Sequence, residues 1–110
     1  YGAVATDASL PQPYRDLALV RQTAAEFDTL PAATIVARMK PLAVAGGPWL
    51  GSAGEMLAAA YIRDGKPALA GPVFAMITRD AAVPSSLRSR AGQMAAMLGT
   101  DAGQAPAAKD

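Results

Sequence analysis

The residues of this chain that could carry out chemistry include five scattered carboxylates, Asp16, Glu26, Asp28, Glu55 and Asp64. Two carboxylates that meet in a fold can act as general acid and general base. No spacing in the sequence pairs them, so we expect solvated positions on helix surfaces. The sequence contains no cysteine and no histidine, which excludes thiol nucleophiles, imidazole bases, disulfides and zinc sites of the Cys/His type. We therefore expect no catalytic residue, no metal ligand and no cofactor, and we predict that the chain is not an enzyme.

Two further groups of residues could bind phosphate. Gly47, Gly51 and Gly54 do not have the spacing of G-x-G-x-x-G, and no G-K-[ST] follows them, so close helix packing explains them better. Arg88 and Arg90 have no carboxylate within reach along their own segment, which indicates either a solvated helix face or a site for an acidic partner. The formal net charge is only +1, and no aromatic residues alternate with these arginines, so we expect no nucleic-acid partner.

The elements that must position these residues are helices. The sequence is 52% hydrophobic but only 5% aromatic, and much of the hydrophobic content is alanine, which favours closely packed helices over a β-sandwich. Apolar residues recur at three- and four-residue steps and are interrupted by glycine and proline. This pattern predicts an all-α domain over residues 11–99 with five helices, after a flexible lead-in over residues 1–10 and before a disordered tail over 100–110. The helices are expected at about 11–27, 31–42, 48–64, 66–79 and 84–98.

Each expected helix has one apolar face that should be buried. We expect Pro41 to kink or fray the last turn of the second helix. In the third and fourth helices, Ala58 and Ala70 are predicted to meet, so that the two backbones approach closely. The predicted faces contain Tyr14, Leu17, Val20, Ala24 and Phe27; Ile35, Val36, Met39 and Leu42; Trp49, Leu50, Ala53, Leu57, Ala58 and Tyr61; Ala70, Val73, Phe74 and Ile77; and Leu87, Ala91, Met94, Met97 and Leu98.

A repeat is visible in the middle of the chain. The order Ala58, Tyr61, Gly65, Ala70 and Phe74, which is small, aromatic, glycine, small, aromatic, resembles the tetratricopeptide repeat of about 34 residues. When the sequence is aligned with itself after a shift of that length, several of these positions have residues of similar type and others do not. The pattern therefore predicts about two antiparallel helical hairpins that stack on each other, closed by a fifth, capping helix.

The chain also resembles one family within this class. The segments that carry the resemblance are 14–18 (YRDLA), 41–43 (PLA), 47–49 (GPW), Ala58 with Tyr61, and 84–91 (PSSLRSRA). They are similar to the tetratricopeptide-like domain of ancillary Sec-translocon subunits of the bacterial inner membrane. The resemblance implies a periplasmic domain, tethered by an N-terminal membrane helix outside this sequence, that links exported proteins to chaperones. A first residue other than methionine fits a processed product or a fragment.

In repeats of this type the first helix of each hairpin lines a concave groove. The resemblance therefore implies a protein-binding groove, with no role in catalysis, formed by Ser52, Glu55, Ala59, Ile62 and Arg63. Met56 and Met76 are further candidates, because flexible methionine side chains suit adaptable surfaces, whereas Met39 and Met94 are expected in the core. The expected partners are proteins: translocon components, periplasmic chaperones or exported clients. Two alternatives remain open, a self-association module that forms homo-oligomers and a helical ligand-binding domain.

Overall fold

The computed structural model describes residues 11–99, and over that range the chain is helical, with no strand. This confirms the all-α fold class. The predicted lead-in over 1–10 and tail over 100–110 lie outside the described residues. The helices are α2 (Gln12–Ala25), α3 (Ala32–Met39), α4 (Leu50–Arg63), α5 (Pro67–Thr78) and α6 (Ser85–Met97).

Proline and glycine mark the helix ends. Pro11, Pro31 and Pro84 directly precede α2, α3 and α6 with ψ angles of 147°, 146° and 144°, the extended conformation usual for the residue that caps a helix. Proline is tolerated at a helix start because its nitrogen has no N–H to leave unpaired. Gly65 ends α4 at a φ of 76°, a left-handed conformation that costs glycine little. Helix α3 ends at Met39, so the expected end near residue 42 is wrong. Pro41 lies in a turn after the helix and does not kink it.

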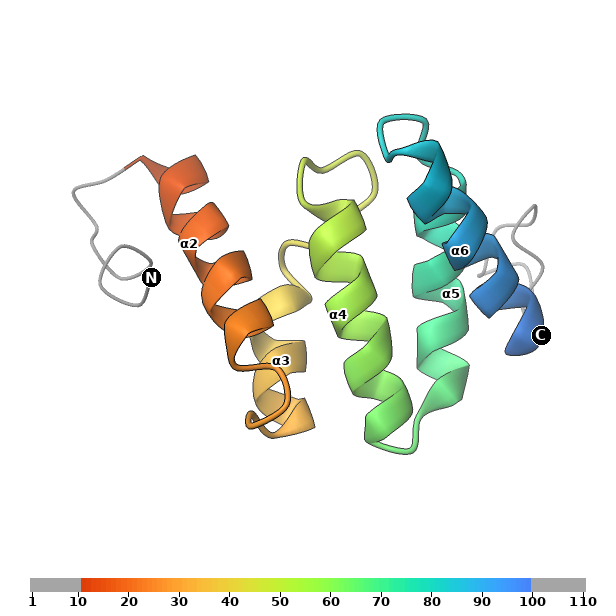
Figure 1. The fold of residues 1–110 in the computed structure, drawn as a ribbon, viewed down its shortest axis with the longest axis horizontal. Coiled ribbons are helices and arrows are strands. Elements are labelled where there is room, and N and C mark those ends of the chain that lie inside the picture. The colour runs from red at the N-terminus through yellow and green to blue at the C-terminus, as the bar shows by residue number, and fades with distance from the viewer. Residues whose placement is uncertain (1–10, 100–110) are drawn as a thin grey trace.

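The five helices form a row in which successive members run in opposite directions (Figure 1). Helix α5 makes extensive contacts with α4 and with α6, and α3 makes fewer with α4. Helix α2 has the fewest contacts, with α3 and α4. The contacts therefore join mainly neighbours along the chain, and α2 and α6 lie at the two ends of the row.

Small residues dominate the core between α4, α5 and α6. A Cβ atom placed on Gly54 would lie 2.9 Å from Cδ1 of the fully buried Ile77, and one on Gly51 would lie 3.0 Å from Cδ2 of Leu87. These two glycines therefore serve close packing. Ala58 and Ala70 are both fully buried, as expected of residues at a close helix contact. The other fully buried alanines are Ala53, Ala60, Ala75, Ala91 and Ala95.

The predicted buried face of α2 is partly wrong. Tyr14 is 60% exposed and Ala24 is also exposed, whereas Ala18, Val20 and Thr23 are buried. The position of Thr23 explains part of the shift, because Nη1 of Arg38 in α3 donates a hydrogen bond to its hydroxyl oxygen at 3.5 Å. A buried polar side chain needs such a partner. The helix is therefore oriented with Thr23 inward and its neighbour Ala24 outward.

The placement of Met97 on the buried face of α6 is also wrong, since its side chain is 77% exposed. Ala91 and Ala95 are the fully buried residues of this helix. Met97 follows Ala95 by two positions and so points about 200° away around the helix. Met94 and Leu98 are half-buried and pack against the core.

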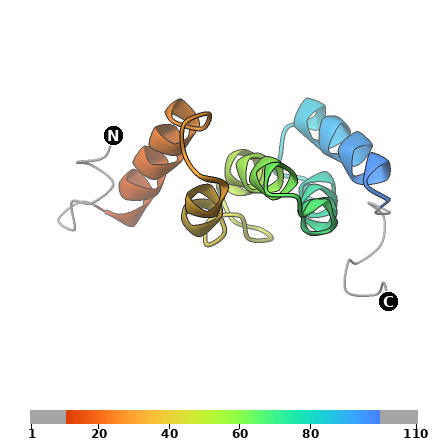
Figure 2. The same cartoon turned by 90° about the horizontal axis from the view of Figure 1, so that it is seen from below.

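In Figure 2, α2 and α6 lie at the top of the view on either side of α4, and α3 and α5 lie at the bottom. We call the surface formed by α2, α4 and α6 on this side the concave face. Of the helices in residues 11–99, none combines the length and apolarity needed to cross a membrane.

Candidate protein-binding face

Two hollows open on the concave face, one on each side of α4. The α2-side hollow has a volume of about 210 Å³, and the α6-side hollow has a volume of about 350 Å³. The first is lined by Ala24, Phe27, Glu55, Met56 and Ala59, and the second by Glu55, Ala59, Phe74, Arg90 and Met94.

Glu55 and Ala59 belong to both hollows. They are four residues apart in α4, so they lie one above the other on a single side of the helix. Both are half-buried. The two hollows therefore share one floor, which α4 provides, with α2 and α6 as opposite walls (Figure 2).

The charged residues in the lining of these two hollows form an ion pair. Nε and Nη2 of Arg90 donate hydrogen bonds to Oε2 of Glu55 at 2.9 and 2.5 Å. The arginine side chain is 62% exposed and the glutamate side chain 32% exposed. The pair links the α6 wall to the α4 floor and leaves the lining with no net charge. The ion pair is not apparent in the sequence, because 35 positions separate Glu55 from Arg90.

Arg63 connects α4 to the segment between α2 and α3. Its guanidinium group donates hydrogen bonds to the carbonyl oxygens of Phe27 at 3.1 Å and Leu30 at 2.8 Å. The same group lies 4.8 Å from the centre of the Phe27 ring, within the range of a cation–π interaction. Arg63 thus holds Phe27 against α4, where the ring lines the α2-side hollow.

The five predicted groove residues occupy different places. Glu55 and Ala59 form the floor of the two hollows. Ser52 is exposed and borders a separate depression of about 230 Å³ beside the α5–α6 connection. Ile62 is 38% exposed, and Arg63, also exposed, is engaged by the two carbonyl groups. The prediction that these residues bind a partner remains a prediction.

The rest of the lining was not proposed for a groove, with one exception. Met56, which was a groove candidate, lines the α2-side hollow. Phe27, Phe74 and Met94 were assigned to buried faces, although each lines a hollow. Ala24 was assigned in the same way and is exposed. Spacing alone could not separate them from the core, because residues at the edge of a buried face share the period of its centre.

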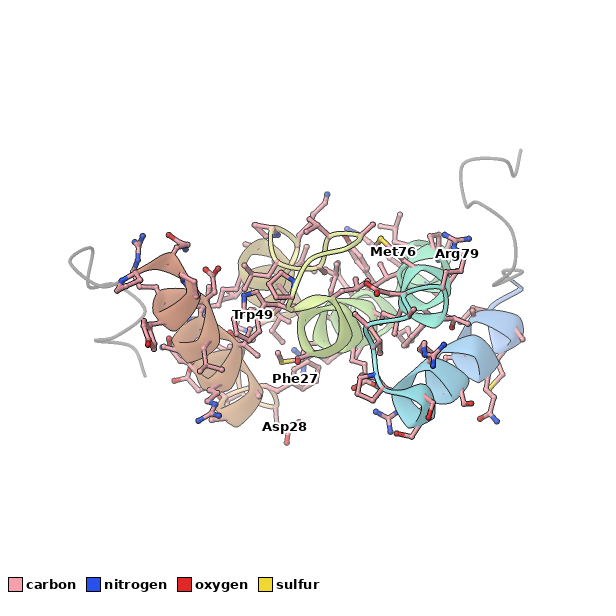
Figure 3. All side chains as sticks on the ribbon, turned by 90° about the horizontal axis from the view of Figure 1, so that it is seen from above. Phe27, Asp28, Trp49, Met76 and Arg79 are labelled. Carbon is pink, nitrogen blue, oxygen red and sulfur yellow. The ribbon has the colours of Figure 1, made fainter. Side chains whose placement is uncertain are left out.

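Met76, the second methionine candidate, lies on the opposite side of the molecule. It lines a hollow of about 320 Å³ with Leu50, Arg79 and Asp80. Figure 3 shows Met76 and Arg79 on one side of the row and Phe27 on the other. The two methionine candidates therefore do not form one surface.

The groups on the concave face can hold a polypeptide by apolar contact and by hydrogen bonds to one ion pair. Residues 11–99 contain no group of three or more Asp and Glu side chains placed to hold a metal ion. Comparison of the chain with protein-family models, with curated proteins and with solved structures finds no match.

Proposed function

We propose that this chain is a protein-interaction domain that holds a segment of a partner polypeptide on its concave face. The observation that carries the proposal is the pair of hollows on either side of Glu55 and Ala59. Apolar side chains line most of both hollows, and partly exposed apolar hollows with a few polar groups are typical of binding sites. Methionine on each side, Met56 and Met94, gives the lining the flexibility to fit different side chains.

The proposal extends to the architecture. In a tetratricopeptide arrangement, α2 with α3 and α4 with α5 would be the two hairpins, and α6 would take the place of the next first helix. The alternating helix directions and the contacts between neighbouring helices support this assignment. The concave face would then be the face that first helices form in such repeats.

The resemblance to ancillary Sec-translocon subunits suggests the setting. The domain would lie at the periplasmic face of the bacterial inner membrane, tethered by a helix outside this sequence. There it would link exported polypeptides or translocon components to chaperones. The supporting residues are those of the resemblance, among them Trp49, which is half-buried at the start of α4 and packs against the core.

Site-specific photocrosslinking tests the proposal. The photoreactive residue p-benzoylphenylalanine is placed at Ala24, which is exposed and lines the α2-side hollow. Lys40, which is exposed at the end of α3, is the control position. The protein is illuminated with purified Sec translocon that carries an arrested exported chain. We expect crosslinks to the chain or to a translocon subunit from Ala24 and none from Lys40. Equal crosslinking from both positions, or none from Ala24, would reject the concave face as the binding surface.

A further inference from the structure

The ion pair on the concave face has hydrogen-bonding capacity left over. Arg90 uses Nε and Nη2, and both contact the same oxygen, Oε2 of Glu55. Within residues 11–99, the other carboxylate oxygen, Oε1, and the third guanidinium nitrogen, Nη1, have no protein partner. Each side chain is partly exposed. An acceptor oxygen on the shared floor and donor N–H groups on the α6 wall are therefore available for a ligand.

An acceptor next to a donor matches the N–H and the C=O of one residue in an extended chain, because these two groups point to the same side. Each residue other than proline has a main-chain N–H that donates and a C=O that accepts, and both need partners when water is removed. Oε1 of Glu55 can accept from the N–H, and Nη1 of Arg90 can donate to the C=O. This recognition does not depend on the ligand's side chains.

The electrostatics favour an uncharged ligand. Glu55 and Arg90 neutralise each other, so the lining offers no uncompensated charge to a charged side chain. A ligand carboxylate on the floor would meet Glu55, and a ligand cation would meet Arg90. In either case the charged group of the ligand would lose bound water next to the apolar walls, and its interaction with the neutral ion pair would not fully offset that cost.

The positions of the hollows favour an extended ligand. They lie on opposite sides of α4, and a helix with its side chains is about 10 Å wide. A polyproline-II segment rises about 3.1 Å per residue with three residues per turn, so residues i and i+3 lie on one side about 9 Å apart. Such a segment has no internal hydrogen bonds, and its amides are free to contact the ion pair. A helical ligand already uses its own main-chain groups.

We propose that the concave face binds an extended, uncharged, apolar segment of an unfolded polypeptide. Its main chain bonds to Glu55 Oε1 and Arg90 Nη1, and apolar side chains at i and i+3 enter the two hollows. The inference rests on the proposed function and adds the chemistry and conformation of the partner.

The test is an NMR titration of the ¹⁵N-labelled protein with synthetic peptides. The parent peptide is acetyl-Gly-Ser-Leu-Gln-Ala-Leu-Ser-Gly-amide, which has leucines at i and i+3 and no charge. A second peptide has its two middle amide nitrogens methylated, which removes their donors. Two more peptides carry Asp-Asp or Lys-Lys in the middle. In a fifth peptide the two residues between the leucines are exchanged to Ala-Gln. It tests whether binding is independent of the side chains at these two positions.

We expect the parent and the Ala-Gln peptide to bind equally, with shifts at Met56, Ala59 and Met94. Loss of one hydrogen bond should weaken the N-methylated peptide about fivefold. Glu55→Ala should weaken the parent by a similar factor but leave the N-methylated peptide unaffected, because both changes remove the same contact. Arg90→Ala should also weaken the parent. Lys40→Ala, which removes a distant exposed charge, should change nothing.

The possible failures are distinct. If no peptide binds at millimolar concentration, the proposed function and this inference both fail. If peptides bind on the concave face but the charged ones bind more tightly, or N-methylation has no effect, the inference fails and the proposed function stands. Additive effects of Glu55→Ala and N-methylation would likewise reject main-chain recognition by the ion pair.

Discussion

The two halves of the row are built from different contacts. In the C-terminal half, α4, α5 and α6 approach closely, because glycine and alanine occupy their contact positions, including Gly54, Ala70 and Ala91. In the N-terminal half, α2 makes few contacts, and two of its contacts with α3 are polar. Arg38 bonds to Thr23 and pairs with Glu26 at 3.4 Å.

The difference in contacts implies a difference in local stability across the concave face. Regions with dense apolar contacts open with a free energy near that of global unfolding, and regions with few contacts open more easily. The α4 floor and the α6 wall therefore belong to the stable half, whereas the α2 wall belongs to the less stable one. Under the proposed function, the α6 wall would stay fixed and the α2 wall could adjust to a bound segment.

The largest effect is expected from a cavity in the stable half. Ile77 is fully buried in α5 against Gly54, so Ile77→Ala should lower the free energy of unfolding by about 2–5 kcal/mol. The matched control is Ile62→Ala, at a position that is 38% exposed in α4, where we expect a smaller loss. Urea unfolding followed by circular dichroism measures both. Equal losses would mean that the packing between α4 and α5 is not the main source of stability.

Overpacking the same contact should have the next largest effect. Gly54→Val places side-chain atoms where a Cβ alone would lie 2.9 Å from Ile77 Cδ1, and should cost about 1–3 kcal/mol. Gly92→Ala is the control, because its Cβ would lie 3.4 Å from Thr78. Removal of a glycine from a helix interior stabilises by about 0.5–1 kcal/mol. Thermal melts that rank the two variants in the opposite order would contradict this description of the interface.

A smaller and more local effect is expected from Arg63→Met. Methionine replaces the aliphatic stem of arginine with an apolar chain of similar length, but it cannot donate the hydrogen bonds to Phe27 and Leu30. We expect amide exchange in α2 to accelerate about fivefold, which corresponds to about 1 kcal/mol, with little change in α5. The control is Lys66→Met, since Lys66 pairs with the nearby Asp64 at 3.2 Å and both are exposed. Equal acceleration in α5 would show that the two halves do not open separately.

The smallest effect on stability is expected from the ion pair. Glu55 and Arg90 are partly exposed, and exposed pairs contribute about 0–1 kcal/mol. Arg90→Ala, Glu55→Ala and the double variant should therefore melt close to the unchanged protein. A double-mutant cycle gives the coupling between the two side chains. A loss above about 2 kcal/mol would assign the pair to the scaffold and remove it as a binding element.

The sequence predicted the helices well and their faces unevenly. Proline and glycine act locally, so most helix ends could be located from residues such as Pro31, Pro84 and Gly65, although α3 ends at Met39 and not at about residue 42. The faces of α4 and α5 were also predictable, because Leu57, Ala58, Val73 and Ile77 are apolar and buried. The face of α2 was not, since Thr23 is buried through a hydrogen bond from Arg38, fifteen positions away.

In the candidate site, too, contacts between residues far apart in the sequence could not be predicted. Glu55 and Ala59 could be placed on the floor from the helical period and the repeat resemblance. The partner of Glu55 could not be identified, because Arg90 comes from α6 and the meeting depends on how α6 packs against α5. Arg63 was assigned a ligand-binding role by its position, but its contacts with Phe27 and Leu30 depend on where the connection between α2 and α3 lies.

The contacts between neighbouring helices have a mechanical consequence. Helices α2 and α6 lie at opposite ends of the row (Figure 1). A pulling force applied at residues 11 and 99 therefore acts on the helix interfaces in series, and each interface carries it. Under such a load the weakest interface separates first, and in this chain it joins α2 to the rest. A modest tension would detach α2 and remove the wall formed by Ala24 and Phe27, while α4, α5 and α6 stayed together. If the proposed function is right, tension across the domain would therefore open the concave face before α4, α5 and α6 unfolded.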